Sequence, residues 1–195
     1  MKRFFVIAME CEAQCVRPHL RQGDELVVCG IGKVNAAAAA QRAIDQGADE
    51  IWNVGLCGGF GDDVEIGGVY EVESAVEYDF DLATLNGTSV GVVDGRDSPY
   101  FPCSPKGVFP AKRLATGDRF NDSEADHGLI ADELGCELRD MEGAAIAHVC
   151  EINGKTYRGL KCVCDIAGRG SMTGQYREYK AKCLERLSEA VAVLV

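Results

Sequence analysis

The sequence predicts an α/β domain with a largely parallel sheet, and three observations support this prediction. Short apolar runs typical of buried strands alternate with longer segments typical of helices, and glycine-rich turns follow two of the runs. The length of 195 residues and the hydrophobic content of 47% suit one domain with a substantial core. Because the chain contains no internal repeat and no low-complexity linker, we expect a single domain over residues 1–195.

The first part of the chain contains three predicted strands and one helix. The apolar run Phe4–Met9 predicts a buried strand, and Leu26–Cys29 predicts a second, shorter one. Lys33–Gln46 contains five consecutive alanines and is followed by a glycine, which favours a helix with a glycine stop. Ile51–Val54 predicts the next strand, which leads into the expected glycine turn Gly55-Leu56-Cys57-Gly58-Gly59.

The second part is less regular. Asp94–Pro110 contains four of the five prolines and predicts a long loop. Further strands are expected within three apolar segments: Val69–Val76, Val108–Leu114 and Tyr157–Val163. Two helices are expected at Met141–Cys150 and Tyr176–Val195, the second because its apolar residues recur at helical spacing.

Charge and cysteine content exclude several classes of protein. The net charge of −11 argues against a nucleic acid or an anionic membrane surface as partner. Ten cysteines are compatible with a secreted disulfide scaffold, but Phe4–Met9 is too short for a signal peptide and is followed by Glu10 and Glu12. We therefore expect a reducing cytosol and free thiols. The cysteine spacings lack the second pair that a zinc site needs, so no metal site is predicted.

Acidic and glycine residues follow the predicted strands one after another. The series runs through Glu10 and Glu12, the Gly30–Gly32 turn, Asp118 and Asp165. In an open α/β sheet a ligand binds beyond the carboxyl ends of the strands, where glycine lets it approach the backbone and a buried carboxylate can transfer protons. Each acid taken alone is more often a helix cap or a solvated loop charge, so it is their repetition after successive strands that favours a site.

Several common nucleotide and hydrolase motifs are incomplete. The Gly30-x-Gly32 turn has Asn35 where a dinucleotide fingerprint has its third glycine. Lys33 follows Gly32, but the first glycine of a phosphate-binding loop and the serine or threonine after its lysine are both missing. The glycine-rich turn carries Cys57 without a paired histidine, so Cys57 is a weak candidate nucleophile and otherwise a small packed residue.

Taken together, six motifs in one order closely resemble the nucleoside phosphorylase/nucleosidase superfamily, most nearly the methylthioadenosine/S-adenosylhomocysteine nucleosidases. The motifs are Ala8–Glu12 (AMECE), Cys29–Ala36 (CGIGKVNA), Asn53–Gly59 (NVGLCGG), Thr116–Phe120 (TGDRF), Asp140–Ala145 (DMEGAA) and Cys164–Asp165 (CD). The resemblance runs from Met1 to about Ser171 and implies a three-layer α/β/α fold with a twisted, mixed sheet.

The resemblance also implies three catalytic residues. Cleavage of an N-glycosidic bond passes through an oxocarbenium-like state and must release a poor purine leaving group. Asp165 resembles the acid that protonates the purine, which requires a carboxyl that stays protonated near neutral pH. Glu12 matches the carboxylate that activates water, or is otherwise only a helix N-terminal charge. Glu142 matches the residue that binds the ribose hydroxyls, and a structural reason for an acid in this apolar run is hard to find.

The remaining matched positions imply substrate contacts. Met141 would pack beside the sugar, Phe120 would stack on adenine (or belong to the core), and Met9 would line the pocket for the alkylthio group. The backbone of Cys57 and Gly58 would lie along the nucleoside.

Four departures from the family pattern bear on the reaction. Leu56 replaces a serine of the glycine turn and Lys161 replaces an arginine, two residues that in this superfamily help to hold phosphate or the nucleophilic water. Cys164, counted with the substrate-binding positions, replaces the serine before the acid and weakens a hydrogen bond to it. A tyrosine- and histidine-containing stretch is changed to Glu77-Tyr78-Asp79. The loss of the serine and the arginine argues against a phosphorylase.

We therefore expect a cytosolic, homodimeric hydrolase that needs no cofactor and releases adenine from a small-molecule nucleoside, methylthioadenosine or S-adenosylhomocysteine. Two alternatives remain open. One is another purine nucleosidase or a phosphorylase, with a futalosine- or inosine-type substrate. The other is a nucleoside-binding protein that has lost catalysis, as the changes at Leu56 and Lys161 would allow.

Overall fold

The computed structural model describes residues 1–93, 95–120 and 123–194, so Asp94 and Val195, which bound two of the predicted segments, lie outside the described residues. The strands of the described chain form one mixed sheet: β1 (Arg3–Ile7), β2 (Glu25–Val28), β3 (Glu50–Gly59), β4 (Val69–Glu77), β5 (Phe101–Pro102), β6 (Ala111–Thr116), β7 (Leu138–Asp140) and β8 (Thr156–Ile166). The helices are α1 (Glu10–Val16), α2 (Lys33–Asp45), α3 (Ala83–Asn86), α4 (Glu124–His127), α5 (Gly143–Ile152) and α6 (Met172–Leu194), with a 3₁₀ turn at Arg17–His19 and a π-helical segment at Gly128–Glu133.

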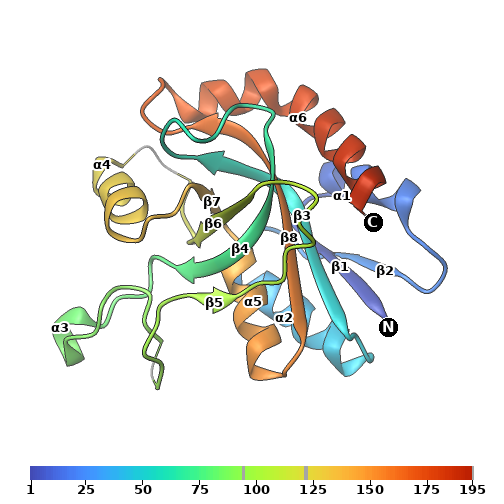
Figure 1. The fold of residues 1–195 in the computed structure, drawn as a ribbon, viewed down its shortest axis with the longest axis horizontal. Helices are drawn as coiled ribbons and strands as arrows, with labels where there is room; N and C mark the ends of the chain where they lie inside the picture. Colours follow the sequence, from blue (N-terminus) through green and yellow to red (C-terminus); the bar gives the residue numbers. More distant parts are fainter. Residues whose placement is uncertain (94, 121–122, 195) are drawn as a thin grey trace.

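The sheet is built around the two long parallel strands β3 and β8, which cross the centre of the molecule (Figure 1). On one side β1 and β2 continue the sheet in parallel. On the other side β8 pairs with β4, β4 with β6, β6 with β7, and β7 returns to β3. The strong twist that this pairing requires brings the ends of β3, β7 and β8 together on one side of the sheet.

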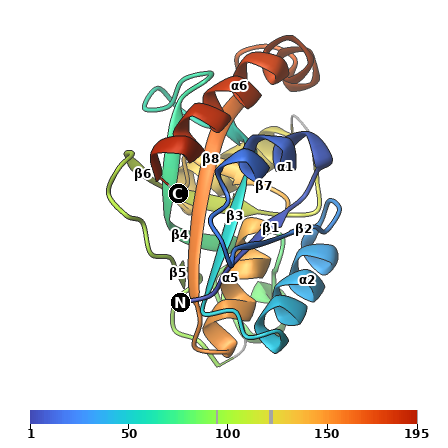
Figure 2. The same ribbon diagram turned by 90° about the vertical axis from the view of Figure 1, so that its right-hand side faces the viewer.

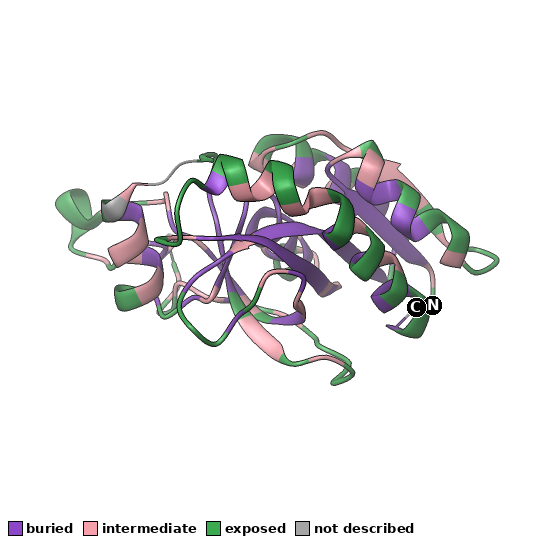
Figure 3. Ribbon diagram, turned by 90° about the horizontal axis from the view of Figure 1, so that it is seen from above, coloured by how far each residue is buried: buried purple, intermediate pink, exposed green. Residues whose placement is uncertain are grey.

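Helices cover both faces of the sheet, as Figure 2 shows, with α1 and α6 on one face and α2 and α5 on the other. Successive side chains of β1 therefore enter different cores: Phe4 and Val6 pack against α2, whereas Phe5 and Ile7 pack against α1 and α6. Burial follows the same layers, with buried strands between helices whose outer sides are exposed (Figure 3). The predicted three-layer α/β fold with a largely parallel sheet is confirmed.

Three predicted boundaries are wrong in ways that matter for the site. Gly55–Gly59 is not a turn but the second half of β3, which stays paired with β8. Cys164 and Asp165 lie within β8 rather than after it. The helix expected from Met141 begins at Gly143 and leaves Glu142 at its N-cap. The glycines misled the prediction because here they make room for neighbouring side chains, which sequence periodicity does not reveal.

Elsewhere the prediction missed short elements. The separate helix α1, the strand β7 and the two-residue strand β5 inside the predicted proline-rich loop were not expected. β6 begins at Ala111, so Val108–Pro110 is not part of a strand. Within the described ranges, every helix is too short or too polar to cross a membrane.

Candidate functional site

A cavity of about 420 Å³ opens where β3, β7 and β8 meet the N-terminal ends of α1, α5 and α6. Eight of the nine residues predicted for the site line it: Met9, Glu12, Cys57, Gly58, Phe120, Met141, Glu142 and Asp165. The ninth, Cys164, is fully buried on the other face of β8, against Cys183 of α6, and does not line the cavity. Cys164 is the extra residue of a β-bulge, since Cys57 and Gly58 of β3 pair with Val163 and Asp165 of β8; its side chain joins the core beneath α6, whereas Asp165 faces the cavity.

Glu12 is fixed at the inner wall of the cavity. It lies in the first turn of α1, where its carboxylate accepts the N–H of Met9 at 3.1 Å and the N–H of Leu56 at 2.8 Å. A Cβ on Gly55 would lie 2.7 Å from Glu12 Oε1, so only glycine allows β3 to pass this close. Burial raises the pKa of Glu12, and the two N–H donors and nearby Lys161 oppose this only in part.

Asp165 faces the same cavity from β8 and is almost fully buried. Its carboxylate lies across β3, where a Cβ on Gly58 would be 3.0 Å from Asp165 Oδ1. Met172, at the start of α6, closes the space beside them. Glycine at position 58 therefore lets the Asp165 carboxylate lie directly against the backbone of β3, at a point where both residues line the cavity.

Glu142 stands at the N-cap of α5, and its Oε1 accepts the N–H of Gly32 at 2.8 Å. Burial is the first cause that raises its pKa, to about 7, and the neighbouring carboxylate of Asp140 adds to the rise. The ammonium of Lys161 and the N–H of Gly32 act in the opposite direction. Glu142 is thus a carboxyl whose protonation changes near neutral pH.

Lys161 is a buried cation next to the part of the cavity wall that Glu12 and Glu142 form. Its Nζ donates to Asp140 Oδ2 at 2.7 Å and to Asn53 Oδ1 at 2.5 Å, and its side chain does not line the cavity. Burial lowers the pKa of Lys161, but the carboxylates of Asp140, Glu142 and Glu12 outweigh it and raise the pKa above its usual value. The ammonium of Lys161 therefore balances the charge of these carboxylates from inside the core and is not exposed to the cavity.

Aromatic and aliphatic side chains line much of the cavity, together with three arginines, Arg119, Arg139 and Arg177. Phe120 is half exposed and meets the ring of Tyr176 edge-on, with the centroids 5.9 Å apart. The Tyr176 hydroxyl lies 3.9 Å from Met9 Sδ, and Ile31 lines the same region. Phe120 is therefore a cavity residue and not part of the core.

Sequence reasoning missed part of the site. Asp140 belongs to a quoted motif but was given no role; it accepts the N–H groups of Glu142 and Gly143 and so fixes the start of α5. Tyr176 was named only as the first residue of the last predicted helix, whereas it lines the cavity. Two acids of the strand-end series lie elsewhere: Glu10 pairs with Arg17 at the surface, and Asp118 caps α2. Among the described residues, no group of His, Cys, Asp or Glu side chains is arranged to hold a metal ion.

Comparison with known proteins gives one consistent family. Residues 23–195 match the model of the phosphorylase superfamily. A 5'-methylthioadenosine/S-adenosylhomocysteine nucleosidase of Thermotoga maritima is 33% identical over 141 residues, which are 71% of this chain and 64% of that protein. The match thus spans less than two thirds of the Thermotoga relative.

Two further relatives bear on the fold and on the substrate. An aminodeoxyfutalosine nucleosidase of Campylobacter jejuni is 31% identical over 62% of this chain and 58% of that protein. The crystal structure of a putative 5'-methylthioadenosine/S-adenosylhomocysteine nucleosidase from Francisella philomiragia superposes with a TM-score of 0.89 at 21% identity, covering 100% of this chain and 98% of the other. At this identity the superposition establishes the shared fold.

The raised pKa of Glu142 predicts how stability varies with pH. In the folded protein Glu142 keeps its proton up to about pH 7, whereas its usual pKa is 4.5, so its contribution to stability is full below pH 4.5 and is lost as the pH rises to about 7. We therefore expect the free energy of unfolding of the wild type to fall as the pH is raised from roughly 5.5 to 8.5. Over this interval the fall should be about 2 kcal/mol larger in the wild type than in Glu142→Gln. Urea unfolding at several pH values measures this difference.

Glu10→Gln is the matched control, because Glu10 is exposed and its pKa lies below its usual value, so this variant should keep the wild-type pH dependence. Parallel stability curves for the wild type and Glu142→Gln would contradict the prediction.

Proposed function

The chain belongs to the phosphorylase superfamily, and from this premise we propose that it hydrolyses the N-glycosidic bond of an adenine thio-nucleoside, methylthioadenosine or S-adenosylhomocysteine, and releases adenine. One observation carries the proposal: Glu12, Glu142 and Asp165, three buried carboxyl groups from three different elements, line a single cavity. The name of the Thermotoga relative supports the same reaction and substrates.

Asp165 is the proposed general acid. Departure of the purine requires a proton on its imidazole nitrogen as the glycosidic bond lengthens. Asp165 is almost fully buried, and both it and the adjacent backbone of Gly58 line the cavity, which supports a base bound against this part of β3. Phe120, a half-exposed aromatic side chain that lines the same cavity, supports stacking on that base.

Glu142 and Met141 hold the ribose in this proposal. A carboxylate that accepts the sugar hydroxyls strengthens those hydrogen bonds as positive charge develops on the ring, which stabilises the transition state. The N–H of Gly32 fixes the Glu142 carboxylate from one side and leaves its other oxygen for the ribose. Met9, next to Tyr176, lines the apolar region that suits the alkylthio substituent.

Glu12 positions the water that attacks the sugar. Its two backbone hydrogen bonds hold the carboxylate in one orientation, and its raised pKa makes it a better base than an exposed glutamate. A phosphate at this position would face the carboxylates of Glu12 and Glu142, while Lys161 is already bound to Asp140 and Asn53. This arrangement favours water over phosphate as the nucleophile.

A second candidate substrate is an aminodeoxyfutalosine-type nucleoside, which the Campylobacter relative supports. Both reactions would use the same three carboxyl groups and differ in the group attached to the ribose 5' carbon.

We also propose a cytosolic homodimer. The ten cysteines of the described chain are free thiols, which supports a reducing compartment. Ile31, which lines the cavity, and Val34, three residues further along the chain, are exposed apolar side chains, which supports a covering second copy.

The proposed roles predict the effect of two conservative variants. Asp165→Asn cannot donate the required proton and Glu12→Gln cannot activate water, so each should lower the rate of adenine release by at least ~100-fold while thermal unfolding stays cooperative. Chromatography of free adenine after incubation with methylthioadenosine measures the rate. Undiminished adenine release by either variant would overturn its assigned role.

The choice of nucleophile is tested with a nucleoside panel. Methylthioadenosine, S-adenosylhomocysteine, aminodeoxyfutalosine and inosine are each incubated with and without inorganic phosphate, and the free base is measured. We expect adenine from the first two substrates at a rate that phosphate does not change. Release that depends on phosphate would identify a phosphorylase, and nucleoside binding by calorimetry without any release would identify a protein that has lost catalysis.

A further inference from the structure

The N–H of Gly32 that holds Glu142 belongs to a residue without a side chain of its own, in a turn where the Asn35 amide donates to the Ile31 carbonyl at 2.8 Å. Gly32 is the N-cap of α2 and has a φ of 102°, a conformation that glycine adopts readily. A Cβ at this position would lie 3.1 Å from Asp118 Oδ1, which crowds the residue further. The position of this N–H must therefore be set by residues around the turn.

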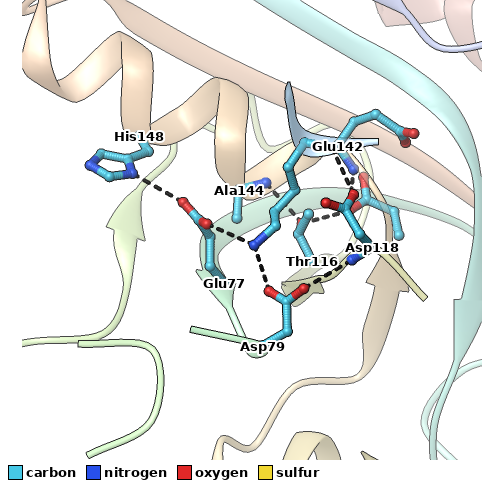
Figure 4. Close-up of polar contacts among 9 residues, drawn as sticks. Glu77, Asp79, Thr116, Asp118, Glu142, Ala144 and His148 are labelled. Atoms are coloured by element: carbon cyan, nitrogen blue, oxygen red, sulfur yellow. Dashed lines mark hydrogen bonds and ion pairs between the residues drawn. The ribbon is translucent and has the colours of Figure 1, made fainter. Parts of the chain in front are cut away.

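Lys33, the next residue, is held at both ends. Its backbone N–H donates to Asp118 Oδ1 at 2.9 Å, so Asp118 caps α2 in place of the missing N-cap side chain. Its Nζ donates to Asp79 Oδ1 at 2.6 Å and to Glu77 Oε2 at 3.1 Å. The second oxygen of Asp79 accepts the N–H of Asp118 at 3.0 Å, which closes a ring of polar contacts around the turn (Figure 4).

The same ring is tied to the helix that carries Glu142. His148 Nδ1 lies 3.0 Å from Glu77 Oε1, and His148 is in the second turn of α5, whose N-cap is Glu142. Figure 4 shows His148, Glu77 and Asp79 following one another toward Asp118 and Glu142. α2 and α5 also pack against each other along the sheet. The polar ring thus connects the N-terminal end of α2 to the N-terminal half of α5.

We propose that Lys33 is a positioning residue for Glu142, because its contacts with Asp79, Glu77 and Asp118 hold the Gly32 N–H on the carboxylate that binds the ribose. This inference rests on the proposed function for the role of Glu142 and concerns the geometry of the same site. It also gives a role to a lysine that lacks the sequence context of a phosphate-binding loop.

The environment of Lys33 agrees with a fixed structural cation. Burial lowers its pKa, but Asp79 and Glu77 outweigh burial and raise the pKa above its usual value, so the ammonium stays charged in the working range of pH. The side chains of Lys33, Glu77 and Asp79 are mostly buried, which strengthens charged hydrogen bonds relative to surface pairs. Lys33 does not line the cavity, so it acts through the turn rather than on the substrate.

The test measures the pKa of Glu142 directly, by ¹³C NMR of glutamate-labelled protein, with the Glu142→Gln spectrum identifying the signal. Two variants loosen the turn with opposite changes of charge: Lys33→Met removes a cation and Asp118→Ala removes an anion. Because the Gly32 N–H lowers the pKa of Glu142, loss of this contact should move the midpoint to higher pH in both variants. The other charged groups that face Glu142, namely Asp140 of β7, Lys161 of β8 and Glu12 of α1, are unchanged in both.

Kinetics provide the second readout. Lys33→Met should lower kcat for adenine release by about tenfold with little change in KM, because a hydrogen bond that strengthens in the transition state is weakened. Lys33→Arg, which keeps the cation, should recover most of the activity. Lys112→Met is the matched control, since Lys112 also forms a largely buried ion pair, with Glu137 at 3.3 Å, but on β6 away from the turn. It should keep the wild-type pKa and kcat.

Midpoints that move in opposite directions in Lys33→Met and Asp118→Ala would overturn the proposal, because charge alone would then explain them. Unchanged midpoints in both folded variants would overturn it as well. If Lys33→Met does not fold, Asp118→Ala decides alone: because loss of the Asp118 anion would by itself lower the pKa of Glu142, a midpoint at higher pH supports the proposal and an unchanged or lower midpoint overturns it. The NMR titration needs no turnover, so it tests the positioning of Glu142 even if the protein releases no adenine and the proposed function fails.

Discussion

The interaction on which the structure depends most is the electrostatic attraction between one buried ammonium and three buried carboxylates, one of which it contacts directly. Lys161 binds Asp140 directly and lies close enough to Glu12 and Glu142 for each to raise its pKa. Removing one partner from such a group would leave an uncompensated charge in the core, which costs about 3–5 kcal/mol. The fold must therefore bring β7, β8, α1 and α5 to one point.

This constraint explains local features that look unrelated in the sequence. Gly55 lets β3 pass against Glu12, and Gly58 lets it pass against Asp165. Asp140 accepts the first N–H groups of α5 and also binds Lys161, so the cap of the helix and the neutralisation of the site share one carboxylate. The site residues are thus supported by backbone donors and by each other, which keeps them in fixed positions before a ligand binds.

Much of the fold and most of the site could be predicted from the sequence, for identifiable reasons. Apolar runs located β1, β2 and the central strands, and ordered motifs identified eight residues that line one cavity. What failed depends on contacts between distant segments. The glycines of β3 were taken for a turn because the reason for them lies in distant side chains: Glu12 beside Gly55, Asp165 beside Gly58 and Val64 beside Gly59. Cys164 was placed at the ligand because its position in β8, and hence the face that it occupies, could not be read from a two-residue motif.

The central claim is that Glu12, Glu142 and Asp165 act on one nucleoside in one cavity. A crystal structure of the Asp165→Asn protein with bound methylthioadenosine tests this most directly. We predict that the purine lies beside residue 165 and Gly58, that the ribose hydroxyls bind Glu142, and that an ordered water on Glu12 faces the C1' carbon. A nucleoside bound outside the cavity, or one with its purine at Glu142 and its sugar at residue 165, would contradict the account.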